Sequence, residues 1–480
     1  MTTHIGSTGL ARLLGDWATG TGSVTSRLAT SVSDLLLDGR LPTGVRLPAE
    51  RDLAAQLGVS RTTVTAAYAS LRDRGFLVSR QGAGSWTKLP PDVARRPRGL
   101  SPTTTAGDVI DLGVASPAAP TAALAVAVQE AAEQLPRHVT GHGYAPAGLP
   151  DLRAAVAERY CRRGLPTDPE HVVITSGAQS ALALLARVLL RPRDAVLVEN
   201  PTYPNARDAL LAAGARLLPV GVDPEGLDAD DVVEALTQSR PRAAYLIPDF
   251  HNPTGTLLDE AGRGALVRAA RVTGTQLVVD ETMVDLVLDE VPVPPPVAAL
   301  AAPDAPVLSV GSLSKSFWGG LRIGWVRGPR AVAATLAAAR PSFDLSTPVL
   351  DQLVATALLA REAELVAARR DELRTRRDVL AAELATRLPS WRFVLPPGGL
   401  SLWVALEQPD ATRLAALARR AGVHVVPGPD FGLHGTLERF LRLPYALPEP
   451  VLREAVARLA LADAELRRAA PTPEAGLLTA

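Results

Sequence analysis

Lysine is scarce in this sequence of 480 residues, which makes one lysine a candidate for covalent chemistry. Only Lys88 and Lys315 are lysines among the 50 basic residues. Arginine keeps its proton in proteins and cannot form an imine with an aldehyde, whereas a lysine amine can. Lys88 stands in a proline-rich stretch, where chance survival explains it. Lys315, in the run Ser312-Leu-Ser-Lys-Ser-Phe, is therefore the stronger candidate for binding an aldehyde.

Three further groups of residues could hold the phosphate and ring of a cofactor. The run Thr175-Ser-Gly-Ala-Gln lies between a predicted strand and a predicted helix, where small residues let a phosphate approach helix amides. Asp280 ends a predicted strand, where a carboxylate could pair with a protonated ring nitrogen, cap a helix or bind a metal. No cluster of His or Cys with ligand spacing accompanies it, which argues against a metal. Arg322, with nearby serine hydroxyls, suits a phosphate dianion.

The first 100 residues contain side chains suited to DNA. They carry 13 Lys+Arg against 7 Asp+Glu in a chain of zero net charge, which indicates a separate module with an anionic partner. Arginine can form two hydrogen bonds to guanine, and hydroxyls suit phosphates or base edges. The candidate DNA contacts are Arg51, Ser60, Arg61, Thr62, Thr63, Thr65, Arg80 and the backbone of Gly82.

The elements expected around these DNA candidates form a small domain. Apolar spacing and caps predict helices over 24–37, 49–57 and 60–74, followed by strands over 76–80 and 85–87 that a glycine-rich turn joins. That order is typical of a helix-turn-helix with a wing, which places its second helix in the major groove. From the pattern alone, a three-helix protein-binding domain is the alternative.

The rest of the chain alternates short strand-like runs with longer helical ones. Strands are predicted over 171–175, 195–199, 216–220, 243–248, 276–280 and 307–310. This alternation indicates an α/β domain with a mostly parallel sheet covered by helices. Helices over 348–386, with strands over 393–404 and 422–426, indicate a smaller α+β part at the C-terminal end. The residues 89–108, rich in Pro, Thr and Arg, are expected to form a mobile linker between the two domains.

Composition and hydropathy exclude several classes of protein. Cys161 is the single cysteine, so there is no disulfide framework, and its helical pattern predicts that it packs rather than reacts. No charged-then-apolar leader opens the chain and no run of about 18 apolar residues occurs, so neither a signal peptide nor a membrane span is expected. The expected location is the cytoplasm.

Residues 24–88 resemble the winged helix of the GntR family. The matching runs are Gly44-Val-Arg-Leu-Pro-Ala-Glu-Arg-Asp-Leu-Ala, Leu57-Gly-Val-Ser-Arg-Thr-Thr-Val, Ala67-Tyr, Leu71, Gly75-Phe-Leu and Gln81-Gly-Ala-Gly-Ser. The resemblance implies that DNA is contacted by Arg51, Arg61, Thr62, Thr63 and Gly82. Many relatives have a further Arg where this chain has Thr65, so its operator is expected to differ there.

Most of residues 110–465 resembles the fold-type I aminotransferases that depend on pyridoxal 5'-phosphate (PLP). The matching runs are Tyr144 with Gly148 and Leu152-Arg153, Ser176-Gly-Ala-Gln, Glu199-Asn-Pro-Thr-Tyr-Pro, Pro248-Asp-Phe-His-Asn-Pro-Thr-Gly, Asp280-Glu281, Ser312-Leu-Ser-Lys, Gly320-Leu-Arg-Ile-Gly and Leu441-Arg-Leu. The resemblance therefore implies a cofactor, PLP, that the residues alone only suggest.

Roles for single residues follow from this resemblance. It implies that Lys315 holds PLP as an aldimine, that Asp280 pairs with the pyridine nitrogen, and that Asn252 reaches the phenolic oxygen while Tyr203 stacks on the ring. The implied phosphate ligands are Ala178, Gln179, Ser312 and Arg322. The implied effector contacts are Arg442, which would clamp an amino-acid carboxylate, and Tyr144, which would reach into a partner subunit's site.

One position departs from the aminotransferase pattern. Relatives usually place a Tyr two or three residues after the Asp that faces the ring nitrogen, where its hydroxyl bonds the phenolic oxygen. This chain has Thr282 and Met283 there. A threonine can partly substitute for that hydroxyl, and a methionine cannot. The departure predicts that the chain binds PLP but is not an efficient turnover enzyme, with transamination limited to partial or half-reaction activity.

A winged helix followed by an aminotransferase-like domain resembles the MocR (GabR-type) branch of GntR regulators over nearly the whole chain. The expected boundaries are 23–88 for the winged helix, 89–108 for the linker and 109–480 for the aminotransferase-like domain, with a large part over about 140–340 and a small part over about 341–470. The resemblance implies a head-to-tail homodimer with each winged helix over the partner's large domain. It also implies a transcription regulator that senses PLP or an amino compound through its cofactor-bearing lysine.

Two other interpretations remain open at this stage. The first is a working aminotransferase, converting an amino acid to a 2-oxo acid, that the winged helix only tethers to DNA. The second is a DNA-binding protein whose large domain is dead and free of PLP. The intact Lys315, Asp280 and Arg322 count against the second, and the missing tyrosine counts against the first.

Overall fold

The computed structural model describes residues 4–18, 23–38, 40–80, 84–90, 109–223, 225–303, 305–433 and 435–468, with the backbone alone for Arg80. The expected linker over 89–108 falls almost entirely outside this description. Gly82 and the tip of the wing lie outside it as well.

The N-terminal domain packs four helices and a two-stranded hairpin around one apolar core. Its elements are α1 (Ser7–Leu14), α2 (Val24–Leu37), α3 (Glu50–Leu57), α4 (Arg61–Asp73), β1 (Leu77–Arg80) and β2 (Gly84–Thr87). Leu28 of α2, Leu53 of α3 and Val64 of α4 are fully buried where the three predicted helices meet. Leu10 of α1 joins the same core, although the sequence pattern begins the domain at residue 23.

The sequence explains the turn between α3 and α4. Gly58 ends α3 with φ 66°, a left-handed conformation that glycine adopts without a Cβ clash. Ser60 then caps α4 by accepting a hydrogen bond of 3.1 Å from the amide of Thr63. The predicted helix-turn-helix and its hairpin wing are confirmed.

A seven-stranded sheet forms the centre of the second domain, in the order β4-β10-β9-β8-β7-β5-β6. The strands are β4 (Val172–Thr175), β5 (Ala195–Asn200), β6 (Arg216–Gly221), β7 (Ala243–Leu246), β8 (Gln276–Asp280), β9 (Val307–Ser312) and β10 (Gly324–Arg327). All pairs are parallel except those of β10, which runs antiparallel to both neighbours. The predicted mostly parallel sheet is confirmed, and β10 is a strand that the sequence analysis did not identify.

Helices cover both faces of this sheet. The helices are α5 (Thr121–Gln134), α6 (Pro150–Arg162), α7 (Ala178–Leu189), α8 (Pro204–Ala212), α9 (Ala229–Ser239), α10 (Glu260–Thr273) and α11 (Arg330–Ala339). Val278 of β8 packs in a core with α7, α8 and α11, whereas its neighbours Leu277 and Val279 pack with α9 and α10. Successive strand residues point to opposite faces, so the buried run of β8 serves two cores.

The smaller C-terminal part packs helices on a three-stranded antiparallel sheet, in the order β11-β14-β13. Its elements are α12 (Val349–Leu359), α13 (Glu362–Arg387), β11 (Ser401–Ala405), α14 (Ala411–Arg420), β12 (Val423–His424), β13 (Val426–Pro427), β14 (Phe440–Pro444) and α15 (Glu449–Arg468). β3 (Ile110–Asp111), the first described strand after the linker, pairs in parallel with β12. The predicted strand over 393–404 was wrong in its first half, because Pro396 and Pro397 lack the amides that pairing needs.

Short 3-10 helices connect these elements at η1 (Leu135–Arg137), η2 (Pro169–His171), η3 (Val297–Leu300), η4 (Gly319–Leu321), η5 (Arg340–Ser342) and η6 (Gly428–Asp430). Cys161 lies on α6, as its helical pattern predicts, but its side chain is exposed, so the expectation that it packs was wrong. Its sulfur lies 3.4 Å from the amide of Thr167. Within the described ranges, every helix is too short or too polar to cross a membrane.

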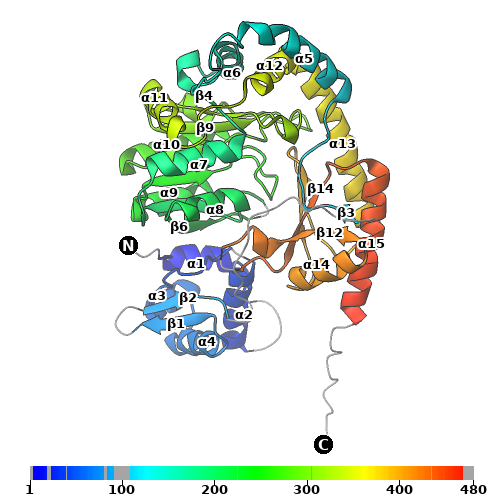
Figure 1. Cartoon of the computed structure of the whole chain (residues 1–480). Coiled ribbons are helices and arrows are strands. Elements are labelled where there is room, and N and C mark those ends of the chain that lie inside the picture. Colours follow the sequence, from blue (N-terminus) through cyan, green and yellow to red (C-terminus); the bar gives the residue numbers. More distant parts are fainter. Residues whose placement is uncertain are drawn as a thin grey trace, which may run out of the picture.

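The winged-helix domain lies against both parts of the second domain of its own chain (Figure 1, blue). Arg12 of α1 pairs with Asp231 of α9, and Asp38 at the end of α2 pairs with Arg439, which directly precedes β14. The small part thus borders the winged helix as well as the large sheet.

Candidate functional site

A cavity of about 390 Å³ lies at the carboxyl ends of the parallel strands. This is the edge at which open α/β sheets bind ligands. Its lining includes every residue predicted to hold the cofactor: Ala178, Gln179, Tyr203, Asn252, Asp280, Ser312, Lys315 and Arg322. Residues from 178 to 322 therefore converge on one site.

Lys315 follows β9 and projects into this cavity. Its Nζ donates a hydrogen bond of 2.8 Å to the carbonyl of Ala115. Burial first, and then the positive charge of Arg442, lower the pKa of Lys315 to about 8, against the opposing effect of Asp280. A lysine with this pKa is partly neutral near pH 7–8, which is the form that attacks an aldehyde.

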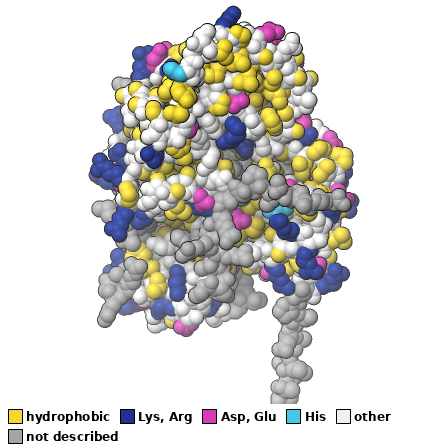
Figure 2. Space-filling view, in the orientation of Figure 1, with side chains coloured by type: hydrophobic (Ala, Val, Ile, Leu, Met, Phe, Trp, Pro, Cys, Tyr) yellow, Lys and Arg dark blue, Asp and Glu magenta, His cyan; other side chains and the backbone are white. Residues whose placement is uncertain are grey.

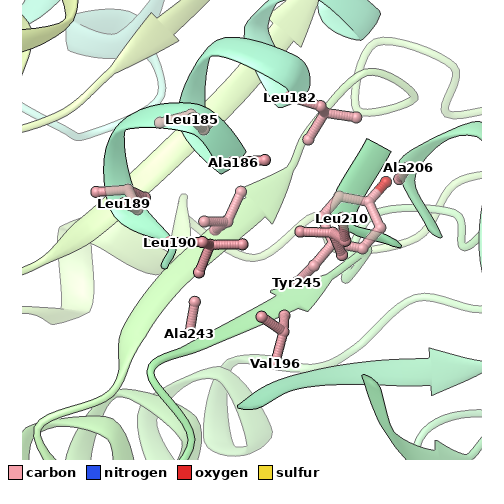
Figure 3. A pocket seen from close by; sticks show the side chains of 11 residues that line it. Leu182, Leu185, Ala186, Leu189, Leu190, Val196, Ala206, Leu210, Ala243 and Tyr245 are labelled. Carbon is pink, nitrogen blue, oxygen red and sulfur yellow. The ribbon is translucent and has the colours of Figure 1, made fainter. Parts of the chain in front are cut away.

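Asp280 ends β8 and is almost fully buried beside the cavity. Its Oδ2 accepts a hydrogen bond of 2.7 Å from the phenol of Tyr245, and its Oδ1 accepts one of 2.9 Å from the amide of Thr282. Burial raises the pKa of Asp280, while these hydrogen bonds and Lys315 lower it. Tyr245 lines a small apolar pocket together with side chains such as Leu182 and Leu210 (Figure 3). Two hydrogen bonds thus fix the orientation of this carboxylate beside the cavity.

The start of α7 and Arg322 form a cradle for an anion in the cavity wall. Gly177, with φ 87°, precedes α7, so the first amides of that helix face the cavity beside Ala178. Arg322 approaches so closely that a Cβ at Gly177 would stand 2.9 Å from its guanidinium. That guanidinium also donates a hydrogen bond of 2.7 Å to the carbonyl of Ser176. The positive φ favours glycine at position 177, where a side chain would also crowd Arg322. The arginine and the helix terminus are thus close enough to hold one phosphate.

Two buried amide oxygens in the cavity wall have no hydrogen-bond partner among the described residues. They are Oε1 of Gln179 and Oδ1 of Asn252. An unpartnered buried polar atom costs free energy, so these side chains fit a polar ligand. Tyr203 lies close enough to Asp280 that burial and this carboxylate raise its pKa. The lining therefore suits a phosphorylated aromatic ring with polar substituents.

The two residues predicted to bind an effector lie outside the immediate lining. Arg442 is buried on β14, with its guanidinium 4.9 Å from the ring of Phe431 and hydrogen-bonded to the carbonyl of Gly113. Burial lowers the pKa of Arg442 to about 10, so it remains charged at neutral pH. Its Nε has no hydrogen-bond partner within the described part of the chain. Tyr144 is 57% exposed and does not reach the cavity of its own chain.

Most of the predicted DNA contacts are exposed at the start of α3 and at the start of α4. Arg51, Ser60, Arg61, Thr62 and Thr65 are exposed, and Thr63 is partly buried. Of the other two predicted contacts, Arg80 is described by its backbone alone, and Gly82 lies outside the described residues.

Glu50 makes this surface less basic than the sequence analysis expected. Its carboxylate accepts a hydrogen bond of 2.7 Å from the hydroxyl of Thr65, which also donates to the carbonyl of Arg61 at 3.0 Å. The hydroxyl of Thr65 is therefore engaged within the domain. Arg46, which the sequence analysis did not single out, is exposed at the base of the wing beside Gly84.

The segment that follows the linker also borders the cavity, and no sequence pattern indicated it. Val114 and Ser116 line the cavity, and they flank Ala115, whose carbonyl accepts the hydrogen bond from Lys315. The carbonyl of Gly113, just before them, accepts a hydrogen bond from Arg442. Ser314 and Gly319 complete the lining near the lysine. Of these residues, only Ser314 could have been placed near the cavity from the sequence, because it directly precedes Lys315.

Comparison with known proteins identifies both domains. The model of the bacterial regulatory proteins of the gntR family matches residues 24–86, and the model of aminotransferase class I and II matches residues 107–459. The chain belongs to the GntR-family regulators that carry an aminotransferase class I and II domain. Its relatives include HTH-type transcriptional regulators that it matches over most of its length, so it is a DNA-binding regulator of MocR type.

Three relatives illustrate this family. The HTH-type transcriptional regulator TauR of Rhodobacter capsulatus is 31% identical over 92% of this chain and 97% of its own length. The rhizopine catabolism regulatory protein MocR of Rhizobium meliloti is 32% identical over 62% of this chain and 64% of its own. The crystal structure of LysN, an α-aminoadipate aminotransferase of Thermus thermophilus complexed with N-(5'-phosphopyridoxyl)-L-leucine, has a TM-score of 0.70 and 32% identity, and covers 75% of this chain and 93% of LysN.

PLP is the cofactor of this regulator. The class I and II domain and the likeness to a phosphopyridoxyl complex indicate it, and the cavity fits it. The fit rests on the anion cradle at Gly177 and Arg322, the fixed carboxylate of Asp280, and a lysine whose pKa is lowered.

Proposed function

We propose that this protein is a transcription regulator whose affinity for its operator depends on PLP, or on PLP together with an amino compound, bound at Lys315. The observation that carries the proposal is the convergence of Lys315, Asp280 and Arg322 on one cavity in a chain that also presents a winged helix. A ligand can change DNA affinity only if it binds the two arrangements of the protein with different affinity.

Each side chain of the cavity is assigned one task in this proposal. Bound PLP supplies an aldehyde that primary amines capture, and Lys315 is the amine of the protein placed to do so. The side chain of Asp280 accepts the ring N–H, and Asn252 binds the phenolic oxygen while Tyr203 covers the ring. The phosphate is held by Ala178, Gln179, Ser312 and Arg322.

The effector in this proposal is an amino compound with a carboxylate. Arg442 is a buried cation whose Nε has no hydrogen-bond partner among the described residues. Its positive charge lowers the pKa of Lys315. A carboxylate would offset the burial of this guanidinium and form paired hydrogen bonds with it. An amino compound whose amine reaches the cofactor and whose carboxylate reaches Arg442 therefore contacts both the large and the small part of the domain.

The proposed assembly is a head-to-tail homodimer. Val126 and Val128 of α5 and Leu350 of α12 are exposed, and hydrophobic side chains gather over this end of the molecule (Figure 2). An apolar surface of this kind is typical of a contact with a second copy. In such a dimer, the exposed Tyr144 would approach the partner subunit's cavity.

DNA recognition is assigned to the exposed first turn of α4. Arg61 and Thr62 are the proposed base contacts, while Arg51, Ser60, Thr63, Arg80 and Gly82 are proposed contacts to phosphate or base edges. Thr65 is left out of this set, because Glu50 and the carbonyl of Arg61 hold its hydroxyl. Arg46 joins them as a proposed phosphate contact. The operator itself is to be found by selecting bound fragments from a random DNA pool.

Gel-shift titrations test the proposed regulation. The selected DNA is titrated with PLP-loaded protein, with PLP-free protein, with Lys315→Ala, and with PLP-loaded protein plus a panel of amino acids. We expect the dissociation constant to differ severalfold between at least two of these states. An identical dissociation constant in all of them contradicts the proposal, provided that the visible absorption of the loaded protein confirms PLP at Lys315.

A working aminotransferase is the second candidate function. Lys315, Asp280, Arg322 and Arg442 are all present, which favours it. Met283 stands where relatives supply a hydroxyl, and its side chain lines the cavity, which counts against efficient turnover. Many turnovers per subunit of an amino acid with a 2-oxo acid would support this candidate, and a single half-reaction would contradict it.

A further inference from the structure

The end of α2 in the winged-helix domain contacts both parts of the aminotransferase-like domain. Leu37 and Asp38 contact the small part, just before β14. Arg40, two residues later, contacts the large part just after β6. One short segment thus spans the border between the two parts.

The contact with the small part combines a backbone hydrogen bond with an ion pair. The amide of Leu437 donates a hydrogen bond of 2.6 Å to the carbonyl of Leu37. The Nε of Arg439 lies 3.0 Å from Oδ1 of Asp38, with both side chains about three-quarters buried. Burial raises the pKa of Asp38, and Arg439 opposes that rise. The pair is therefore shielded from water more than a surface ion pair is.

Leu437 has an unusual backbone conformation for this contact. Its φ is 76°, in the left-handed region that leucine rarely adopts. Its side chain is buried, and its carbonyl lies so close to Gly428 that a Cβ there would stand 2.2 Å away. A buried, strained residue that gives its amide to another domain is held by its surroundings in one position. Movement of this loop would therefore move the end of α2.

The contact with the large part is equally close. The Nε of Arg40 lies 2.9 Å from Oδ1 of Asp223. A Cβ on Gly221, the last residue of β6, would stand 2.9 Å from the carbonyl of Arg40, so the two backbones touch. Arg12 of α1 adds an ion pair of 3.2 Å to Asp228, at the start of α9.

The two contacts of α2 involve the same two parts of the domain that supply Arg442 and Lys315. Arg442 stands three residues after Arg439, on β14 of the small part. Lys315 follows β9 of the large sheet, to which β6 also belongs. A ligand that joins the cofactor site to Arg442 spans the same border that the end of α2 spans on the outside.

We propose that the surface formed by Asp223, Leu437 and Arg439 is the docking site of the chain's own winged-helix domain and transmits ligand binding to it. The inference rests on the proposed function and adds its physical route. A ligand between Lys315 and Arg442 shifts the small part against the large one, and the contacts of Leu37, Asp38 and Arg40 carry that shift to α2. Hinge and shear movements of packed parts are the ordinary means of such coupling. In a head-to-tail dimer, the same two surfaces would meet between subunits.

The test uses a ligand that spans both sides of the cavity in one molecule. N-(5'-phosphopyridoxyl)-L-leucine, the compound bound in the LysN structure, carries the phosphate, the ring and a carboxylate. Its affinity for the full-length protein is measured by calorimetry. The dissociation constant for the selected DNA is then measured with and without it, and their ratio is the coupling factor.

Four proteins are compared: wild type, Arg439→Ala, the charge-reversed pair Asp38→Arg with Arg439→Glu, and Arg453→Ala. Arg453 is a matched control, because it is a half-exposed arginine of the small part whose partner, Glu383, lies in the same part. We expect Arg439→Ala to bind the compound normally while its coupling factor falls to a third of the wild-type value or less. The charge-reversed pair should recover much of it, and Arg453→Ala should keep it in full.

The outcomes separate this inference from the proposed function. A coupling factor that Arg439→Ala leaves unchanged overturns the inference and leaves the regulator intact. If the wild type binds the compound without any change in DNA affinity, the proposed function fails for this ligand, and hydrogen exchange of the amides over 34–38 decides the inference. A ligand-induced change of exchange in the wild type that Arg439→Ala abolishes supports the docking surface, and no change in the wild type overturns it.

Discussion

The phenol of Tyr245 donates a 2.7 Å hydrogen bond to the carboxylate of Asp280 from the strand next to it in the sheet. Tyr245 is buried on β7, and Asp280 is the last residue of β8. Burial raises the pKa of Asp280, and this hydrogen bond is one of the interactions that lower it. Tyr245 therefore favours the ionised carboxylate that a protonated ring nitrogen requires.

Replacing Tyr245 with phenylalanine should weaken cofactor binding. A hydrogen bond to a charged group contributes about 1.5–3 kcal/mol, so we expect PLP to bind roughly tenfold or more weakly in Tyr245→Phe. The change is measured by following the visible absorption as PLP is added to the PLP-free protein. Tyr445→Phe removes an equally buried hydroxyl that donates to Gly398 in the small part, and it should leave PLP affinity unchanged.

The pKa of Lys315 should make the stability of the PLP-free protein depend on pH. The folded pKa of about 8 lies below the ordinary value of 10.5, so the unfolded chain binds more protons between these two values. The free energy of unfolding must then rise as pH increases from about 8 to 10.5, and the full deficit, roughly 3 kcal/mol, is present below pH 8.

Lys315→Met isolates this contribution. Urea unfolding at pH 7.0 and pH 9.5 should show a smaller gain in stability for Lys315→Met than for the wild type across the interval. Lys88→Met is the matched control, because Lys88 is the other lysine of the chain and is exposed. Equal pH dependence in Lys315→Met and the wild type would mean that the amine is not desolvated.

Much of the cavity could be predicted from the sequence because its residues stand in runs with a local signature. Asp280 ends a parallel strand and Lys315 follows one, and parallel strands bring their carboxyl ends to one edge. Arg322 precedes β10, whose antiparallel direction brings its first residue to the same edge. Tyr245 gave no such signal. β7 is buried on both faces, so its pattern does not distinguish a tyrosine that reaches Asp280 from one that fills the core.

Contacts made by residues outside any motif could not be predicted. Asp38 and Arg439 are 401 positions apart, and neither belongs to a recognisable motif. The same holds for Glu50, whose carboxylate holds the hydroxyl of Thr65 across the turn of the helix-turn-helix. Local pattern defines elements and their ends, whereas the meeting of two domains depends on surfaces that only the folded chain creates.

Introducing the missing tyrosine should increase transamination. Met283 lines the cavity, and the residue after it, Val284, is buried. Because position 283 faces the cavity, Met283→Tyr places a hydroxyl beside the position proposed for the phenolic oxygen. One added hydrogen bond of about 1.4 kcal/mol corresponds to a tenfold faster reaction. We expect about this gain in the rate at which amino acids convert the bound cofactor, recorded by single-turnover absorption. Met283→Phe, which adds the ring without the hydroxyl, should show no gain.

Arg61 should determine sequence preference at one position of the operator. Its side chain is exposed in the first turn of α4, which the capping by Ser60 fixes in orientation. If the guanidinium bonds guanine with two hydrogen bonds, Arg61→Ala should weaken specific binding by about 1–3 kcal/mol and leave random-sequence DNA little affected. Fluorescence anisotropy with selected and scrambled DNA measures both. Equal losses on the two DNAs would make Arg61 a phosphate contact instead, and the slope of log Kd against log salt would then fall by about one.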